Sequence, residues 1–228
     1  MISERQAQII KNLVKEYIKT AEPVSSKFLA EKYDFGICPS AIRIEFQALI
    51  REGFLEQPHT SAGRVPTDKA YRFFVDNLKE KREEKIEEEI TEILRGMQDK
   101  FRMASEITKF LADSSSSFVN LHFSKEGFDL KEGLDEIFKE PEARDEDFIS
   151  SFVNFMENFE KNTEKLQTGI YIGEESRIPK SKDITLICSE CKLPNQKAFI
   201  TILGPKRMDY EKNIKLINAL NRALKELI

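Results

Sequence analysis

The sequence of 228 residues predicts an α+β protein with an N-terminal winged helix-turn-helix, a helical connector and a small C-terminal α+β domain. Residues 39–52 have helical apolar spacing and precede a polar turn at 57–66, which is the order of helix and hairpin in a winged helix. A mixed-charge stretch follows, and β-like segments then alternate with helical ones. We therefore expect domains at residues 1–78, 79–113 and 114–228.

Two helices are expected before the winged-helix turn. Ser3 and Gln6 have the spacing of a capping box, and an apolar stripe follows at helical spacing from Ile9 to Ile18. Pro23 ends this helix, since proline restricts its predecessor and lacks a backbone N–H. Ser25 is placed to cap a second, short helix that runs to Tyr33.

A third helix, beginning near Pro39, carries the first candidate DNA-binding residues. Its apolar positions (Ile42, Phe46, Leu49, Ile50) fall on one side, and the opposite side carries Ser40, Arg43, Ile44 and Gln47. Arginine can pair with guanine and glutamine with adenine in the major groove. A polar outer face is also the rule for ordinary surface helices, so the turn that follows is what favours DNA binding.

The turn supplies the remaining candidate DNA-binding residues, which are His59, Thr60, Ser61, Gly63 and Arg64. Hydroxyl residues and glycine at a hairpin tip let the backbone approach phosphates closely. Arg64 is expected to add a planar, permanent charge there.

Four segments resemble the heat-inducible transcription repressor HrcA family: residues 20–26, 41–45, 57–66 and 203–210. Two positions depart from that family's pattern, which has Asn at Ile44 and Gly at Ala70. The resemblance implies a repressor of chaperone operons that binds an inverted-repeat DNA operator as a homodimer. It also implies help from the chaperonin GroEL, loss of repression on heating, and a GAF-like regulatory domain, here shortened.

Two other functions remain open. The GAF-like domain could hold a small molecule, which would make the chain a ligand-gated transcription regulator. A pocket lined by buried polar groups would favour that function, and a close-packed centre would count against it. A winged helix used for protein contacts should instead carry an apolar hairpin face.

The connector and the C-terminal domain are predicted from periodicity. Apolar residues from Ile86 to Leu111 continue at steps of three and four, which indicates one long helix packed on its own domain or on a second subunit. We expect strands at 118–123, 169–173, 183–188 and 198–203, and helices at 129–139 and 145–166. Asp209 is placed to cap a closing amphipathic helix.

Composition narrows the function further. The net charge is -4, and residues 1–78 hold 11 Lys and Arg against 10 Asp and Glu, so a basic surface must come from local clustering. We expect a cytoplasmic protein, with no export signal or membrane span and with Cys38, Cys188 and Cys191 reduced. The pair Cys188 and Cys191 lacks partners for a zinc site, and neither His59 nor His122 belongs to a recognisable triad. We expect no enzyme activity, cofactor or metal.

Overall fold

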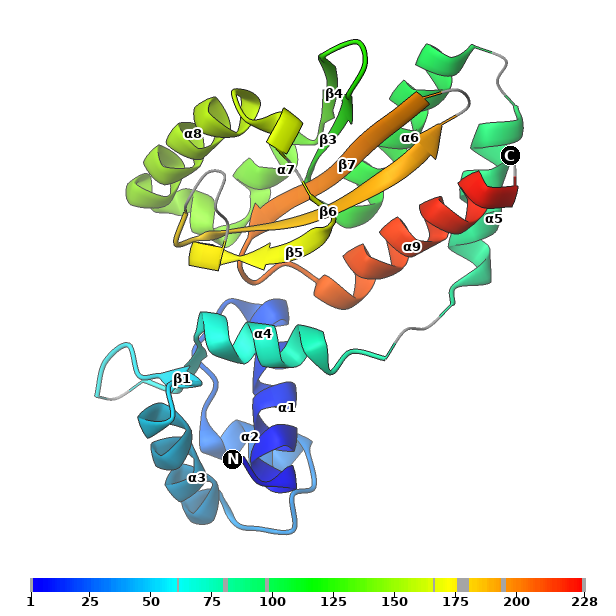
Figure 1. The fold of residues 1–228 in the computed structure, drawn as a ribbon. Coiled ribbons are helices and arrows are strands. Elements are labelled where there is room, and N and C mark those ends of the chain that lie inside the picture. The colour runs from blue at the N-terminus through cyan, green and yellow to red at the C-terminus, as the bar shows by residue number, and fades with distance from the viewer. Residues whose placement is uncertain are drawn as a thin grey trace. The chain divides into compact units, whose positions relative to one another are not determined.

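A computed structural model describes residues 2–60, 62–79, 82–96, 99–165, 167–175, 181–193 and 196–226 (Figure 1). The chain divides into two compact units, Met1–Leu78 and Lys79–Ile228. Each unit buries its own apolar core. The predicted α+β class is confirmed, because helices accompany an antiparallel five-stranded sheet.

The first unit consists of helices and a short hairpin. Its elements are α1 (Glu4–Thr20), α2 (Ser26–Lys32), α3 (Pro39–Arg51), β1 (Leu55–Glu56), β2 (Val65–Pro66) and α4 (Asp68–Asp76). The predicted caps are confirmed: Ser3 forms a capping box with Gln6, and Ser25 accepts from the Phe28 amide. Thr67 caps α4 in the same way, by accepting from the Ala70 amide. Side chains of α1, α3 and α4 fill the core, including Ile10, Leu13, Ile42, Leu49 and Tyr71.

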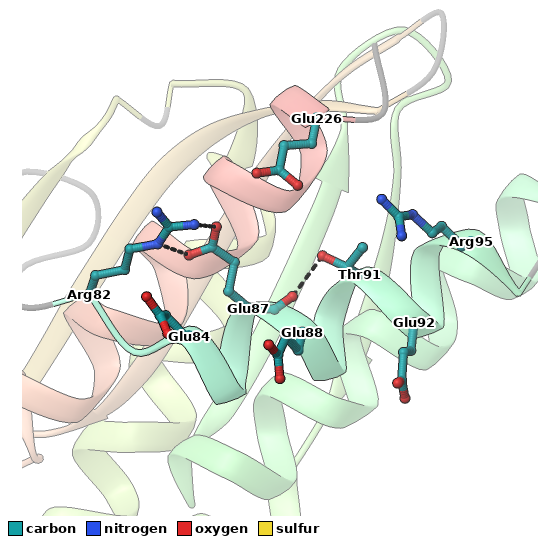
Figure 2. A pocket seen from close by; sticks show the side chains of 8 residues that line it. All are labelled: Arg82, Glu84, Glu87, Glu88, Thr91, Glu92, Arg95 and Glu226. Atoms are coloured by element: carbon teal, nitrogen blue, oxygen red, sulfur yellow. Dashed lines mark hydrogen bonds and ion pairs between the residues drawn. The ribbon is translucent and has the colours of Figure 1, made fainter.

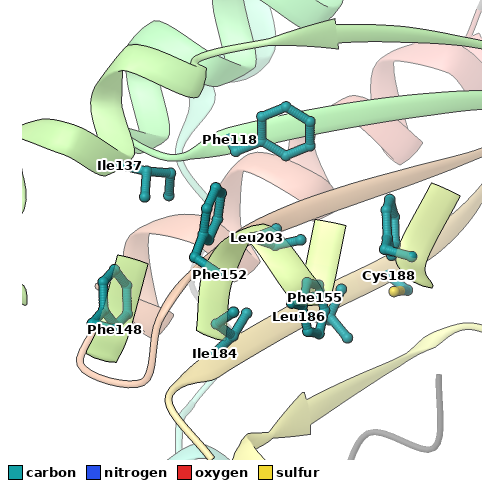
Figure 3. Close-up of a cluster of buried hydrophobic side chains, with 10 residues drawn as sticks. Phe118, Ile137, Phe148, Phe152, Phe155, Ile184, Leu186, Cys188 and Leu203 are labelled. Atoms are coloured by element: carbon teal, nitrogen blue, oxygen red, sulfur yellow. The ribbon is translucent and has the colours of Figure 1, made fainter. Parts of the chain in front are cut away.

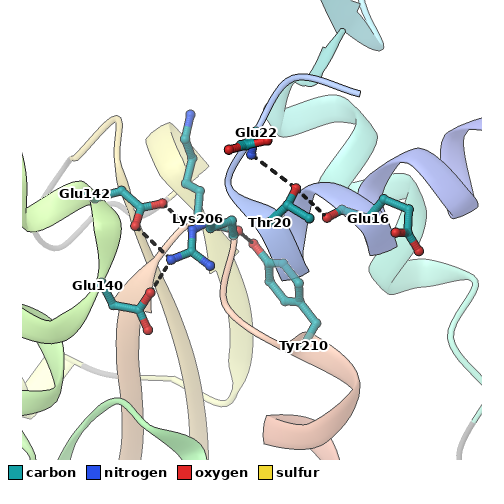
Figure 4. A network of polar contacts seen from close by, with 8 residues as sticks. Glu16, Thr20, Glu22, Glu140, Glu142, Lys206 and Tyr210 are labelled. Atoms are coloured by element: carbon teal, nitrogen blue, oxygen red, sulfur yellow. Dashed lines mark hydrogen bonds and ion pairs between the residues drawn. The ribbon is translucent and has the colours of Figure 1, made fainter. Parts of the chain in front are cut away.

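A buried carboxylate joins α1 to the end of α2. Glu16 is 1% exposed and accepts hydrogen bonds from Lys32 Nζ at 2.6 Å and Tyr33 Oη at 2.5 Å. Burial alone would raise the pKa of Glu16, but the hydrogen bonds from Lys32 and Tyr33 outweigh burial and lower it. At the end of α1, Thr20 Oγ1 donates to the Glu16 carbonyl and accepts from the Glu22 amide (Figure 4).

The second unit is built around a sheet with strand order β4-β3-β7-β6-β5. Its strands are β3 (Phe118–Phe123), β4 (Phe128–Glu132), β5 (Gly169–Ile172), β6 (Ile184–Leu193) and β7 (Gln196–Pro205). Its α-helices are α5 (Glu84–Arg95), α6 (Lys100–Ser115), α7 (Leu134–Lys139), α8 (Glu146–Glu160) and α9 (Tyr210–Glu226). Three short 3₁₀ turns complete it, at Pro141–Arg144, Thr163–Lys165 and Gly173–Glu175.

Helices cover both faces of the sheet. On one face, phenylalanines of α8 pack against Phe118, Leu186 and Leu203 of the strands (Figure 3). Side chains alternate along a strand, so Ser189 of β6 points to the opposite face, where it accepts a hydrogen bond from Asn221 of α9. Helix α6 also packs on that opposite face, where Phe101 stacks on Phe128. The closing helix has the predicted cap, because Asp209 Oδ1 accepts from the Lys212 amide at 3.0 Å.

The predicted single helix across 86–111 is wrong. Helix α5 ends at Arg95, with Gly96 as its C-cap, and Asp99 caps α6 by accepting hydrogen bonds from the amides of Phe101 and Arg102. Met97, one of the expected apolar positions, lies outside the described residues. The sequence left open whether this helical segment packs on its own domain or on a second subunit. In the structure it packs on its own unit, since α5 lies along α9.

Ion pairs fix α5 against α9. Glu87 accepts from Arg222 Nε at 2.9 Å, and Glu83 pairs with Lys215 at 2.6 Å. Arg82 and Glu87 point toward one another, with Arg82 donating to both carboxylate oxygens at 2.8 and 3.1 Å (Figure 2). The hydrogen bonds from Arg82, helped by Arg222, lower the pKa of Glu87.

The helix predicted at 129–139 is also wrong in its first half. Residues of β4 alternate between apolar and charged, and they pair with β3 in the register Leu121↔Leu130. Gly133 then turns the chain with a positive φ of 78°, and α7 begins only at Leu134. After α7, the carboxylates of Glu140 and Glu142 (Figure 4) both bind the guanidinium of Arg207, which follows β7.

Candidate nucleic-acid interface

Helix α3 has one buried and one exposed face. Pro39 occupies its first turn, and Ile42, Phe46 and Leu49 are buried against the rest of the first unit. The opposite face carries Ser40, Arg43, Ile44 and Gln47, which are all exposed. These four residues are spaced by three or four positions or are adjacent, so they form one continuous patch. We call them the α3 outer face.

Two contacts at the start of α3 affect this patch. Arg43 Nε donates to Ser26 Oγ of α2 at 3.3 Å, so the Arg43 side chain is steered along the edge of α2. Cys38 Sγ lies 3.0 Å from Ser40 Oγ, and this hydrogen bond lowers the pKa of the exposed Cys38 thiol. Neither contact covers the α3 outer face.

The hairpin that follows α3 is short and ordered by its own polar groups. Its strands pair in the register Leu55↔Pro66 and Glu56↔Val65. At the tip, Gln57 Nε2 donates to the Thr60 carbonyl at 2.8 Å, and the Ala62 amide donates to the His59 carbonyl at 2.9 Å. His59 and Thr60 are exposed, as expected, whereas Ser61 lies outside the described residues.

Gly63 lies at the base of the hairpin and not at a free tip. The strand-like pair Val24↔Arg64 joins this base to the loop between α1 and α2, through two backbone hydrogen bonds of 2.8 and 2.9 Å. A Cβ at Gly63 would fall 2.5 Å from the backbone carbon of Val24 and 2.6 Å from that of Pro23. Glycine is therefore required by close packing of two backbone segments, which corrects the expected role in approaching phosphates.

The expectation that Arg64 presents an exposed charge is wrong for this geometry. Arg64 is 8% exposed, and its Nη1 donates to the carbonyls of Ala62 and Gly63, each at 3.1 Å. Its guanidinium lies 5.8 Å from the centre of the Phe46 ring, and burial lowers its pKa. Arg64 thus holds the hairpin base against α3 from within.

The Val24–Arg64 pair could not be predicted from local spacing, because its partners are 40 positions apart. The available signal was Gly63 itself, since a close approach of another backbone segment is a common reason for glycine near a strand. Lys69 was also missed. It is exposed beside the hairpin base, donates to the Glu52 carbonyl at 2.6 Å and lies 4.3 Å from the Phe54 ring centre.

The cysteine pair of the second unit does not form a site. Cys188 and Cys191 are both buried in β6, three positions apart, so their side chains point to opposite faces of the sheet. Burial raises the pKa of Cys188 to about 11 and that of Cys191 to about 12, which keeps both thiols protonated. Among the described residues, no group of three or more His, Cys, Asp and Glu could hold a metal ion.

An apolar surface groove of about 750 Å³ lies between α7 and α8 of the second unit. Leu134, Phe138 and Val153 line it and are each about half exposed, while Glu132, Asp135, Glu157 and Glu160 surround it. Its lining is apolar, not the set of buried polar groups expected of a small-molecule sensor. Under α8 the core is packed with phenylalanine. None of the helices in the described residues has the length and apolarity to cross a membrane.

Comparison with known proteins gives two results. A family model described as "HrcA protein C terminal domain" matches residues 55–214. Proteins named heat-inducible transcription repressor HrcA are 44% identical over 106 residues in Desulforamulus reducens and 53% identical over 89 residues in Carboxydothermus hydrogenoformans. These segments cover 46% and 39% of this chain but only 30% and 26% of the two relatives.

A crystal structure of a hypothetical protein at 2.2 Å resolution is similar along almost the entire chain. It has a TM-score of 0.79 and 17% sequence identity, and the match covers 99% of this chain and 97% of that one. At this identity the likeness concerns the fold alone.

Proposed function

This chain belongs to the HrcA family, and we propose that it is a transcriptional repressor whose first unit is a winged helix that binds operator DNA. The observation that carries the proposal is the exposed α3 outer face, followed directly by an ordered polar hairpin. The relatives named as heat-inducible repressors support it. The matched segments cover under a third of those relatives, so repression by this chain is our inference and is not given by the relatives' names alone.

In the proposed complex, α3 enters the major groove. Arg43 and Gln47 read base edges there, since their side chains can pair with guanine and adenine respectively. The hairpin tip, with exposed His59 and Thr60, contacts the neighbouring phosphates. Arg64 has no phosphate contact in this arrangement, because its guanidinium is buried and donates to two backbone carbonyls of the hairpin.

The second unit is proposed as the regulatory and dimerisation domain. One winged helix makes few phosphate contacts, so useful affinity at physiological salt requires two on an inverted-repeat operator. A homodimer meets this need, with half-sites a whole number of helical turns apart. Light scattering at micromolar concentration should return twice the 26.4 kDa chain mass. A value of one chain mass, with and without operator DNA, would contradict the dimer.

The response to heat follows from the family, and its proposed partner is the chaperonin GroEL. Chaperonin would keep the second unit active, and diversion of chaperonin to unfolded clients on heating would then lower repression. Operator binding by heated protein should recover when GroEL is added. Recovery of equal size with an unrelated protein added at the same mass would count against a chaperonin-specific effect.

The experiment that tests the central proposal is selection of bound sequences from random duplex DNA. We expect an inverted repeat to be enriched. Arg43→Ala should then weaken binding by about 1–3 kcal/mol and relax the preference at one base pair of each half-site. Enrichment of no sequence, or an unchanged base preference in Arg43→Ala, would contradict the assignment of α3 as the reading helix.

A second candidate is a ligand-gated regulator, for which the groove between α7 and α8 offers a site only to an apolar ligand. An apolar ligand in that groove should change the affinity of the full chain for its operator. A screen of apolar carboxylates and amines by thermal shift, with Val153→Arg as the blocked control, separates this candidate from the first.

A further inference from the structure

Ile44 is an unusual residue for its position. It is 71% exposed, the highest value among the large apolar side chains of the described residues. Among the described residues of the first unit, Phe28 is the other exposed large apolar residue, at 39%, and the ammonium of Lys32 lies 5.2 Å from its ring centre. Ile44 therefore offers bare apolar surface on a helix whose own apolar face is already buried.

Three polar side chains lie next to Ile44 on the α3 outer face. Ser40 lies one turn before it, Gln47 lies one turn after it, and Arg43 is its neighbour in sequence. Arg43 is anchored to Ser26 and Ser40 to Cys38, so the two patch side chains that precede Ile44 are held in place, while Ile44 itself is apolar. This arrangement places a single branched aliphatic side chain in the middle of a reading surface.

From this arrangement, we propose that Ile44 reads the 5-methyl group of a thymine and so selects T at one position of each operator half-site. The inference rests on the proposed function, because it requires α3 to lie in the major groove. Isoleucine has no hydrogen-bonding group, and the thymine methyl is the apolar group that the major groove presents.

The same side chain also rejects other bases. Guanine presents two acceptors, cytosine a donor, and adenine one of each. An aliphatic side chain that covers any of these groups displaces the water bound to it and offers no hydrogen bond in return. The free energy of binding is then less favourable. Ile44 thus discriminates both by contact with a methyl group and by exclusion of unpaired polar groups.

The test uses the full chain and the operator obtained by selection. Each thymine is replaced in turn by deoxyuridine, which lacks only the 5-methyl group. At one position per half-site, loss of the methyl should weaken binding roughly fourfold, and loss in both half-sites roughly fifteenfold, from the value of one buried carbon group. If cytosine is placed at that position, 5-methylcytosine should recover part of the lost affinity.

Variants at Ile44 connect the effect to this residue. With Ile44→Ala, the same deoxyuridine substitution should change affinity less than twofold, because the methyl has lost its contact. Ile44→Asn should move the preference toward adenine, which an amide can pair with. Since Ile44 is exposed, both Ile44 variants should unfold at the same temperature as the parent. Gln47→Ala is the matched control: in this variant, replacing the thymine by deoxyuridine should weaken binding as much as it does in the parent.

The outcomes separate the two proposals. Failure of selection to enrich any operator would refute the proposed function itself. An operator whose affinity is insensitive to deoxyuridine at every thymine, or equally sensitive with Ile44→Ala, would leave DNA binding standing and overturn the role of Ile44.

Discussion

Replacing Gly63 by alanine should detach the hairpin from the loop between α1 and α2. The new Cβ would lie 2.5 Å from the carbonyl carbon and oxygen of Val24, both backbone atoms that cannot rotate away. Loss of two backbone hydrogen bonds costs about 1–3 kcal/mol, and residual crowding adds about 1–3 kcal/mol. Alanine also lowers the entropy of the unfolded chain, which stabilises the protein by about 0.4–1 kcal/mol. The free energy of unfolding should therefore fall by about 3 kcal/mol in all.

Hydrogen exchange at the amides of Val24 and Arg64 measures this effect directly, because these two amides form the bridge. Both should lose protection in Gly63→Ala, and operator affinity should fall with them. Gly36→Ala is the control in the same unit: a Cβ there meets nothing within 4 Å and only its φ of 67° is unfavourable, at about 1–2 kcal/mol. Unchanged protection at Val24 and Arg64 in Gly63→Ala would refute the reasoning.

Two further predictions concern charged groups of the first unit. Arg64→Met should keep apolar packing over Phe46 but lose the bonds to two carbonyls, so stability should fall by about 1–2 kcal/mol while the slope of log affinity against log salt stays the same. A slope reduced by about one would mean that Arg64 does contact a phosphate. Glu16 has a lowered pKa in the folded state, so its contribution to stability is present above its unfolded pKa and is lost as pH falls through the folded value. Urea denaturation of Glu16→Gln should therefore show a weaker loss of stability below about pH 4.5 than the parent, and identical pH profiles would contradict this role.

Local signals in the sequence were sufficient where the physics is local. A cap needs only a side-chain oxygen and an amide two or three residues later, so Ser3, Ser25 and Asp209 could be identified from spacing alone. The exposed side of α3 followed in the same way from a period of 3.6 residues.

Other features depended on tertiary contacts, which the spacing of residues along the sequence does not reveal. Continuous apolar spacing through 86–111 suggested one helix, but the cap at Asp99 and the packing of α5 on α9 divide it. The segment 128–132 alternates apolar and charged residues as a strand does, yet its charged residues also suit a helix, and pairing with β3 decided between them. Arg64 was expected to be exposed because a charge at a turn usually is, but its backbone pairs with Val24 and its guanidinium lies near Phe46, and it is buried.

The position of β7 in the sheet has a consequence for biosynthesis. This strand lies at the centre of the sheet and pairs with β3 on one side and β6 on the other, but it is contributed by residues 196–205. A ribosome adds about 5–20 residues per second, so β3 waits for several seconds before its central partner exists. During that interval Phe148, Phe152, Phe155 and Phe159 of α8 have no completed sheet to pack against. The nascent chain thus exposes an aromatic helix until residues 196–205 have been synthesised.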